Sequence, residues 1–427
     1  MSDVFLPAPL ARHEGRLFFD GVDLARCAAL ADTPVWVYAI DAVVESYRTF
    51  ADAFSPLPLA VSYAVKANSS RAVLGALARA GCGFDVGSRG ELHRVRAAGG
   101  EASRTTMTGV GKTADDMRDG LEAGIHRFNV ESIEECLRLD TIAGAMGREA
   151  TVLVRINPDV DAVTHPAIAT GLAEHKFGLT PDDVREALPR LAALAHVRVV
   201  GWSMHLGSQI TDAEIFAAGL RRLLAFAAEA APAFAHTELE INIGGGLGVP
   251  YHATQSALSP SVLALTLRPI LDASPLPVAR LHAEPGRTLV ANAGVLLARV
   301  EYVKRTAART FVILDAGMND LVRPALYDAW HEIVPLVDHG DRGVEVVDVV
   351  GPVCETGDTF SVQRRLPRMA DGDLVAVLGA GAYGATMSST YNARPLAPEI
   401  CIRNGELILT RRRQSLDELL AGELPVA

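Results

Sequence analysis

Short runs of apolar, β-branched and aromatic residues recur along the first two thirds of the chain. Each run is followed by a stretch with apolar residues at helical spacing. The runs predict buried strands, and the stretches between them predict amphipathic helices. The predicted strands are "AVSYAVK" (60–66), "GFDV" (83–86), "TTMTG" (105–109), "RFNV" (127–130), "TVLVRIN" (151–157), "VVGWSMHL" (199–206), "ELEINIGG" (238–245) and "RLHAEPG" (280–286).

Helix starts support this alternation. Stretches such as "TADDMRDGLEAGI" and "SIEECLRLDTIAGAMG" follow a residue that can cap the first turn, as at Thr113, Ser132 and Thr180. Strands that alternate with helices pair in parallel, and eight such units predict an α/β fold closed into a (β/α)8 TIM-like barrel. An open doubly wound sheet is the alternative, but no GxGxxG opens the first unit.

The pattern changes from about residue 288. Segments such as "FVILDAG", "VEVVDVVGPVC", "DLVAVLGAG" and "ELILTRRR" are short strands with turns and few helical stretches between them. This pattern is typical of a mainly antiparallel β-sandwich or β-barrel domain. The chain therefore divides into a barrel, which we place at 35–287, and a second, β domain.

Polar residues gather at one end of the predicted barrel strands. Barrel enzymes keep their active sites at the carboxyl ends of the strands. One polar residue at a strand end is ordinary, because loops are solvated, but a lysine, a histidine and a glutamate at the same end favour a site. The residues at these ends are Lys66, Asp85, Asn129, Arg155, Asn157, His205, Gly244, Gly245, Gly246 and Glu284.

Lys66 closes an apolar run, where an ammonium group must be solvated, paired or chemically used. The glycine run "GGGLG" (244–248) follows the seventh strand, where barrels commonly bind phosphate through bare backbone N–H groups. A lysine, a phosphate-binding loop and a carboxylate such as Glu284 suit pyridoxal 5′-phosphate (PLP). The lysine would carry the cofactor, and the carboxylate would keep its ring nitrogen protonated. We therefore expect PLP as the cofactor.

Composition narrows the functional class only slightly. The chain has 427 residues, a net charge of -11, 49% hydrophobic and 21% charged residues. There is no basic surplus for nucleic acid, no apolar run of membrane-spanning length and no pattern of a signal peptide at the start. Five scattered cysteines without a CxxC pair fit a reduced cytoplasmic protein without a disulfide framework or a metal site.

The chain resembles the alanine-racemase-fold (fold type III) PLP-dependent decarboxylases, and within them the branch that acts on diaminopimelate. The resemblance runs from about residue 35 to residue 402. The matching stretches are "YAVKAN", "FDVGSRGEL", "GVGKT", "FNVES", "VRINPDVDAVTHPAIATG", "HKFGL", "MHLGSQI", "GGGLGVPY", "EPGR", "DAGMNDLVRPALYDAWHEI", "GPVCETGD" and "GAYGATMSSTYNARPLAPEI".

The resemblance implies roles around the cofactor. Lys66 would carry it covalently, His205 would stack on the ring, and Glu284 would bond the ring nitrogen. A carboxylate there favours decarboxylation over racemisation, because the related racemases have an arginine at that position. Asp85 and Arg155 would line the ring. Ser208, Gly244, Gly245, Gly246 and Tyr383 would hold the phosphate, and Gly286 would also contact the cofactor.

The resemblance also implies the reaction: meso-2,6-diaminopimelate would lose carbon dioxide and give L-lysine. Arg287, Arg323 and Tyr327 would bind the distal carboxylate, with Tyr383 also at the substrate, and Glu355 would take the distal ammonium. Arg287 could instead lean toward the phosphate. A related decarboxylase acting on another amino acid, or on a carrier-bound one, is the alternative, since "GSRGE" and "ANSSR" depart from the commonest family pattern.

Cys354 would supply the proton that replaces the lost carboxylate. In the family, Cys354 and Glu355 reach the site from a partner subunit, so the resemblance implies a homodimer. Residues 1–34, which include "GRLFFDGVDLA", would join 288–427 in a β domain that contributes to the dimer interface. The loop "DAVTHPAIATGLAEHKFG" could close over the site or be permanently ordered.

Three other classes are disfavoured. A PLP-binding barrel protein without activity would lack the β domain and "CETGD". A regulatory homologue would be expected to have lost Lys66 or Cys354, and both are present. A racemase is disfavoured by Glu284 and Cys354.

Overall fold

The computed structural model describes residues 5–57, 59–160, 176–234, 239–340 and 342–424. The chain divides into two compact units, each described here by itself. The barrel unit comprises residues 44–249 and 256–289, and the β unit comprises 1–43, 250–255 and 290–427. Among the described residues, no helix combines the length and apolar character needed to cross a bilayer.

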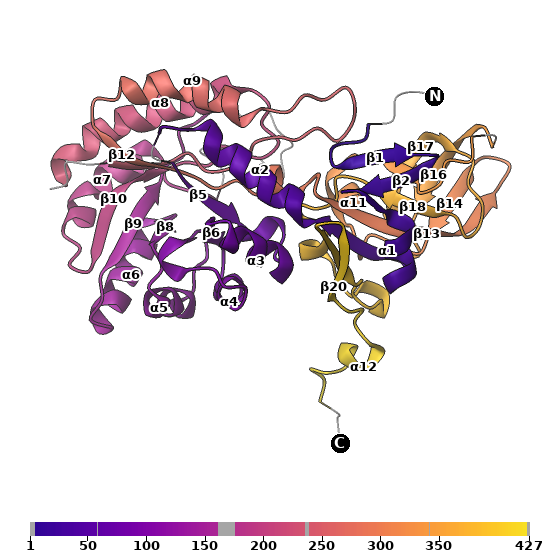
Figure 1. Cartoon of the computed structure of the whole chain (residues 1–427). Helices are drawn as coiled ribbons and strands as arrows, with labels where there is room; N and C mark the ends of the chain where they lie inside the picture. The colour runs from indigo at the N-terminus through magenta and orange to yellow at the C-terminus, as the bar shows by residue number, and fades with distance from the viewer. Residues whose placement is uncertain (1–4, 58, 161–175, 235–238, 341, 425–427) are drawn as a thin grey trace. The chain divides into compact units, whose positions relative to one another are not determined.

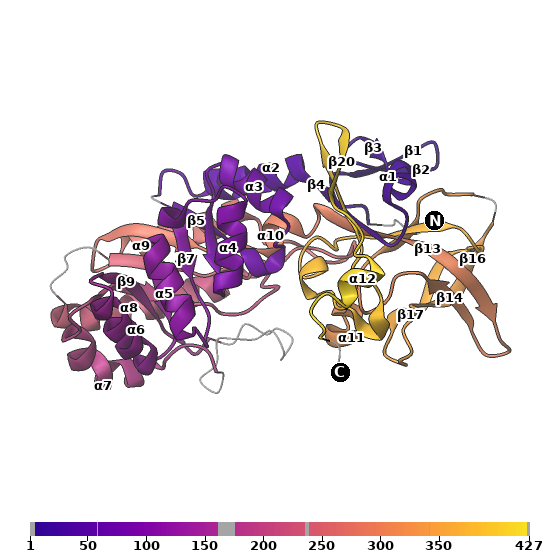
Figure 2. The same cartoon turned by 90° about the horizontal axis from the view of Figure 1, so that it is seen from below.

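The barrel unit is built on eight parallel strands that close in the order β10-β11-β12-β5-β6-β7-β8-β9. This closure confirms the predicted (β/α)8 barrel and excludes the open sheet. Figure 2 shows α4, α5 and α6 side by side along the outside of the strands. The strands are β5 (Leu59–Ala64), β6 (Gly83–Val86), β7 (Thr105–Met107), β8 (Arg127–Val130), β9 (Ala150–Arg155), β10 (Val197–Ser203), β11 (Leu239–Asn242) and β12 (Val278–Ala283).

Helix starts in the barrel unit follow the predicted caps. Thr113 and Thr180 each form a reciprocal capping box with the aspartate three residues later, and the Ser132 hydroxyl accepts from the backbone N–H of Glu135. The helices are α3 (Arg71–Arg79), α4 (Arg89–Ala97), α5 (Ala114–Ala123), α6 (Ile133–Ala145), α7 (Pro181–Ala192), α8 (Ala213–Ala230) and α9 (Pro260–Asp272), with short 3-10 turns η1 (Val65–Ala67), η2 (Ala102–Arg104) and η4 (Ala231–Ala233). Two more helices, α2 (Ile40–Ala53) and α10 (Arg287–Val290), cross the boundaries between the two units.

The β unit is mainly antiparallel, as predicted, with two parallel pairs, β4 with β19 and β14 with β16. Its larger sheet runs in the order β17-β16-β14-β13-β4-β19-β20. β18 pairs with both β13 and β15, and Figure 1 shows β18 next to β13. Its elements are β1 (Leu10–His13), β2 (Arg16–Phe19), β3 (Val22–Asp23), α1 (Leu24–Ala31), β4 (Val35–Ala39), β13 (Gly294–Arg305), β14 (Thr310–Leu314), α11 (Arg323–Tyr327), β15 (Ile333–Pro335), β16 (Val344–Val350), β17 (Thr359–Pro367), β18 (Leu374–Val377), η5 (Ala385–Met387), η6 (Tyr391–Ala393), β19 (Glu399–Arg403), β20 (Glu406–Arg411) and α12 (Leu416–Leu419).

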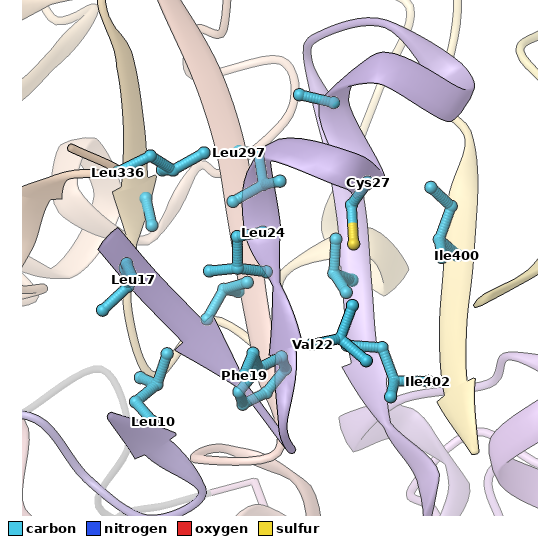
Figure 3. Packing of buried hydrophobic residues seen from close by; sticks show 14 of the residues in the cluster. Leu10, Leu17, Phe19, Val22, Leu24, Cys27, Leu297, Leu336, Ile400 and Ile402 are labelled. Atoms are coloured by element: carbon cyan, nitrogen blue, oxygen red, sulfur yellow. The ribbon is translucent and has the colours of Figure 1, made fainter. Parts of the chain in front are cut away.

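The N-terminal segment shares the core of the β unit. Leu17, Phe19 and Leu24 are fully buried among side chains from much later in the chain, including Leu297 and Ile400 (Figure 3). Apolar side chains of this size each contribute about 1.5–3 kcal/mol when they leave water. This shared burial ties the first strands to the last ones.

The unit boundaries differ slightly from those expected at residues 35 and 287. β4 pairs with β13 and β19 of the β unit, so residues 35–43 belong there and not to the barrel. The segment 250–255 also belongs to the β unit, although barrel residues precede and follow it. Strand pairing decides the placement of β4, whereas side-chain packing, such as that of Tyr251 against His331, ties 250–255 to the β unit.

We predict that Gly201→Ala destabilises the barrel unit. Gly201 pairs with Glu240 between β10 and β11, and a methyl group there would lie 1.8 Å from the Glu240 carbonyl oxygen. Such overpacking against the backbone should cost about 3 kcal/mol or more. Gly111→Ala is the control, because a methyl group there meets nothing within 4 Å. Thermal unfolding measured for both variants checks this, and equal midpoints would contradict it.

Candidate active site

The carboxyl ends of the barrel strands bring together the predicted cofactor residues of the barrel unit. Lys66 lies in η1, just after β5, where we expected the strand itself to continue. Asp85 lies in β6, Arg155 ends β9, and Glu284 follows β12 directly. Because the strands are parallel and the barrel is closed, these ends form one rim. The Lys66 side chain is exposed at that rim.

Glu284 is fixed by two amide groups. Its Oε1 accepts one hydrogen bond from Asn129 Nδ2 at 2.7 Å and another from Asn242 Nδ2 at 2.6 Å. Asn129 also donates to Thr108 Oγ1 at 2.9 Å. The carboxylate is buried, so these bonds fix its orientation. Sequence reasoning marked Asn129 as a strand-end residue but missed Asn242, which lies just before the glycine run.

Asp85 is electrostatically coupled to the same group. Burial and the repulsion of Glu284 raise the pKa of Asp85 to about 8, although the Lys66 ammonium opposes the shift. The Asp85 carboxyl therefore holds a proton close to neutral pH. The charges of Lys66 and Glu284 thus act on Asp85 within one site, and a carboxyl with so perturbed a pKa is typical of functional sites.

His205 presents a single neutral tautomer. Burial lowers the pKa of His205 well below its ordinary value, and the charges of Arg155 and Lys66 lower it further. Its Nδ1 accepts a hydrogen bond from the backbone N–H of Gly245 at 3.1 Å. The ring proton must then lie on Nε2.

Arg155 is held by a carboxylate that sequence reasoning missed. Its Nη1 contacts Glu131 Oε1 at 2.9 Å and Oε2 at 3.2 Å, and both residues are buried. Its Nη2 donates to the carbonyl oxygen of His205 at 3.3 Å. Arg155 therefore braces the backbone beneath the histidine while Glu131 balances its charge.

A second buried ion pair lies beside the first. Lys112 Nζ contacts Glu135 Oε1 at 2.6 Å and also donates to the carbonyl oxygens of Asn129, at 2.6 Å, and Gly109, at 2.8 Å. Glu135 Oε2 accepts from the backbone N–H of Glu131 at 2.9 Å. The sequence held a sign of these ion pairs: the charged residues of "GVGKT" and "FNVES" lie next to predicted buried strands.

The glycine run allows close approach of three loops. A Cβ on Gly245 would lie 2.2 Å from the Glu284 carbonyl oxygen, and one on Gly246 would lie 2.2 Å from that of Gly207. The backbone N–H of Gly244 donates to Asn242 Oδ1 at 2.8 Å, and that of Gly245 donates to His205. Two of the three N–H groups expected at the phosphate are thus engaged within the protein, and the phosphate role stays a prediction.

Arg287 lies beside the predicted phosphate hydroxyl. Its Nη2 donates to Ser208 Oγ at 2.9 Å. A Cβ on the preceding Gly286 would lie 3.0 Å from that of Ala67, next to Lys66. Of the two positions considered for Arg287, this bond favours the one toward the phosphate.

The other predicted residues belong to the β unit. Arg323 and Tyr327 begin and end α11. Tyr383 has a φ of 56°, a left-handed conformation that is rare for an aromatic residue and common at functional sites. Cys354 and Glu355 lie between β16 and β17, both exposed, and a hydrogen bond with Glu355 raises the pKa of Tyr391.

Two other parts of the chain were considered as functional elements. The candidate lid loop lies mostly outside the described residues, since 161–175 are not among them. His126, Glu240 and His282 offer ligand atoms within 4.8 Å of one another, an arrangement that could hold a metal. However, Arg127 Nη1 lies 2.6 Å from His282 Nε2 and 3.0 Å from Glu240 Oε2. The guanidinium takes the place of a cation, so we assign this cluster to a buried ion-pair network.

Comparison with known proteins identifies relatives over almost the whole chain. The family model for the pyridoxal binding domain of pyridoxal-dependent decarboxylases matches residues 40–291. The diaminopimelate decarboxylase of Pseudomonas aeruginosa is 47% identical over 411 residues, which cover 96% of this chain and 97% of the relative.

Solved structures of diaminopimelate decarboxylases are also similar to this chain over almost its whole length. Diaminopimelate decarboxylase from M. jannaschii in co-complex with L-lysine is 34% identical, with a TM-score of 0.90 and 98% of both chains covered. The Helicobacter pylori enzyme complexed with L-lysine is 34% identical, with a TM-score of 0.87, covering 93% of this chain and 98% of that one.

We predict that Asp85→Asn changes how stability depends on pH in the ligand-free protein. From the ordinary carboxyl pKa of 3.8 up to about 8, folded Asp85 holds a proton that the unfolded chain has released. The free energy of unfolding should therefore fall as pH rises through that range, and the asparagine should remove this fall. Thermal midpoints at pH 5 and pH 8 check this. The variant should gain stability over the wild type at pH 8 relative to pH 5, and an equal difference at both values would contradict the coupling.

Proposed function

The chain belongs to the diaminopimelate decarboxylases, a branch of the pyridoxal-dependent decarboxylase family, and on that premise we propose how its residues perform the reaction. The reaction is the decarboxylation of meso-2,6-diaminopimelate to L-lysine with PLP as cofactor, a step of lysine biosynthesis. The observation that carries the proposal is the arrangement at the rim. An exposed lysine and a buried carboxylate fixed by two asparagines lie at the carboxyl ends of neighbouring strands, β5 and β12.

The rim residues fit the cofactor. Lys66 would bind it covalently, and Glu284, oriented through Oε1, would hold a proton on its ring nitrogen. Bound PLP supplies an acceptor for the electron pair released when the bond to the departing carboxylate breaks. Neutral His205 would stack on the ring without adding charge, and Asp85 and Arg155 would line it. Ser208, Gly244, Gly245, Gly246, Gly286 and Tyr383 would surround the phosphate, with Arg287 bonded to Ser208.

The distal end of the substrate carries an amino acid group of its own. Arg323 and Tyr327 would bind its carboxylate, a task suited to the planar guanidinium, and Arg287 and Tyr383 would border it. Glu355 would receive the ammonium. An enzyme for ornithine or lysine would have no carboxylate to bind there, so an arginine in α11 favours the longer dicarboxylic substrate.

Cys354 is suited to return a proton to the substrate carbon. It is the exposed cysteine, whereas Cys27, Cys82, Cys136 and Cys401 are buried. Burial raises the pKa of each buried thiol to about 12, which keeps those four inert. We further propose a cytoplasmic homodimer in which Cys354 and Glu355 complete the site of the partner subunit. The reduced cysteines support this compartment, and the family resemblance supports the dimer.

The substrate is tested by carbon dioxide release from the PLP-loaded protein. We expect release from meso-diaminopimelate, with L-lysine as product, and none from L-lysine, L-ornithine, L-arginine or L-glutamate. Turnover of one of these four instead would keep the fold and cofactor but overturn the substrate. If none of the five amino acids releases carbon dioxide, the alternative substrate, a carrier-bound amino acid, would be favoured.

The shared site is tested by mixing two inactive variants. Lys66→Ala lacks the cofactor lysine, and Cys354→Ala lacks the proton donor. If Cys354 serves the partner subunit, mixed dimers contain one complete site, and re-equilibrated equimolar mixtures should recover roughly a quarter of the wild-type activity. If each chain supplies its own cysteine, no mixture contains a complete site and activity stays absent.

A further inference from the structure

Arg323 is anchored by a side chain to which the proposed reaction gives no role. Its Nη1 lies 2.8 Å from Nε2 of His331. Both residues are buried, with 5% of Arg323 and 1% of His331 exposed. The other ring nitrogen of His331, Nδ1, lies 2.7 Å from the carbonyl oxygen of Leu378. A carbonyl oxygen only accepts, so Nδ1 carries the proton and Nε2 offers its lone pair to the guanidinium.

The strand ladder holds this imidazole in place. β15 pairs with β18 with Ile333 opposite Val377, and the Leu378 N–H donates to the Glu332 carbonyl oxygen at 2.8 Å. Leu378, whose carbonyl oxygen accepts from the His331 ring, thus continues the backbone pairing of β15 with β18. Arg364 Nη1 donates to the backbone carbonyl oxygen of His331. Ring and backbone are therefore both fixed.

An aromatic ring completes the support of the guanidinium. Tyr251 lies edge-on to His331, with ring centroids 5.4 Å apart at 74°. The Arg323 guanidinium carbon lies 4.9 Å from the centroid of the same tyrosine ring, in range for a cation–π contact. Tyr251 comes from the segment 250–255, which follows the glycine run and belongs to the β unit.

We propose that His331 is a positioning residue that, together with Tyr251, sets the Arg323 guanidinium for the distal carboxylate of the substrate. This rests on the proposed function, which assigns that carboxylate to Arg323. An imidazole acceptor orients a guanidinium without cancelling its charge, whereas a carboxylate such as Glu131 on Arg155 does both. A neutral anchor is thus suited to an arginine that must bind a substrate anion.

A purely structural role for His331, tying α11 to β18, makes different predictions, because the two ring nitrogens can be replaced separately. In His331→Gln the amide oxygen can reach the position of Nε2 and accept from Arg323. In His331→Asn the amide can still donate to Leu378, but it is too short to reach the guanidinium. The first variant keeps the bond to Arg323, and the second keeps the bond to the strand.

Two ligands isolate the carboxylate. L-Lysine keeps the distal carboxylate, since only the reacting one leaves as carbon dioxide, and cadaverine is the same molecule without it. We would measure the dissociation constants of both with PLP-loaded wild type, the two His331 variants and His252→Gln. The last is a matched control from segment 250–255, where His252 packs against Trp330.

We expect the preference for L-lysine over cadaverine to stay within about threefold of the wild-type value in His331→Gln and in the control. In His331→Asn it should fall by about tenfold, through weaker L-lysine binding with cadaverine binding unchanged. Tyr251→Leu removes the aromatic ring beside the guanidinium and should lower the preference in the same way. If His331→Asn does not fold, Tyr251→Leu takes its place in the test.

An unchanged preference in His331→Asn or Tyr251→Leu, with only a lower thermal midpoint, would show a structural role and overturn the proposal. If the wild type decarboxylates diaminopimelate but these variants keep its preference for L-lysine, only the role of His331 is overturned. A wild-type protein without any preference for L-lysine and without activity on diaminopimelate would overturn the proposed function as well.

Discussion

Closure of eight parallel strands is the constraint on which the site depends, because it forces every strand of the barrel to end at one rim. Residues more than 200 positions apart in the chain, such as Lys66 and Glu284, follow the ends of neighbouring strands, β5 and β12. Within that rim, Asn129 and Asn242 reach across from β8 and β11 to one oxygen of Glu284. The orientation of this carboxylate is therefore set by the barrel itself and not by a loop.

The buried charges of the barrel unit are organised in pairs around this centre. Arg155 pairs with Glu131, Lys112 with Glu135, and Arg127 with Glu240. Each pair avoids the large cost of an isolated buried charge and also bonds to the backbone or to a neighbouring side chain. Asp85 differs, because burial beside Glu284 leaves it protonated close to neutral pH. The barrel unit thus holds these three buried cations in ion pairs, while the Asp85 carboxyl lies beside the carboxylate of Glu284.

Hydrophobic periodicity was enough to predict the barrel, because each buried strand and amphipathic helix is a local pattern. Capping residues such as Thr113 were equally local, and they were confirmed. The strand ends were less predictable. Nothing in "SYAVKAN" marks where the strand pairing stops, so the sequence did not show that Lys66 lies in a 3-10 turn after the strand. The partners Glu131, Asn242 and His331 were missed, because a polar residue shows its partner only once the fold brings distant segments together. The hydrogen bond between His331 and Leu378, 47 residues apart, is one such case.

Lys66 is the residue to which the proposed site binds its cofactor, and the chain has only three other lysines, Lys112, Lys176 and Lys304. Treatment of the PLP-loaded protein with borohydride would make the cofactor–lysine link permanent, and mass spectrometry of the peptides would locate it. We expect the label on Lys66 alone and its loss in Lys66→Ala, since Lys112 is buried against Glu135. A label on any other lysine, or an unchanged label in Lys66→Ala, would contradict the assignment of the site.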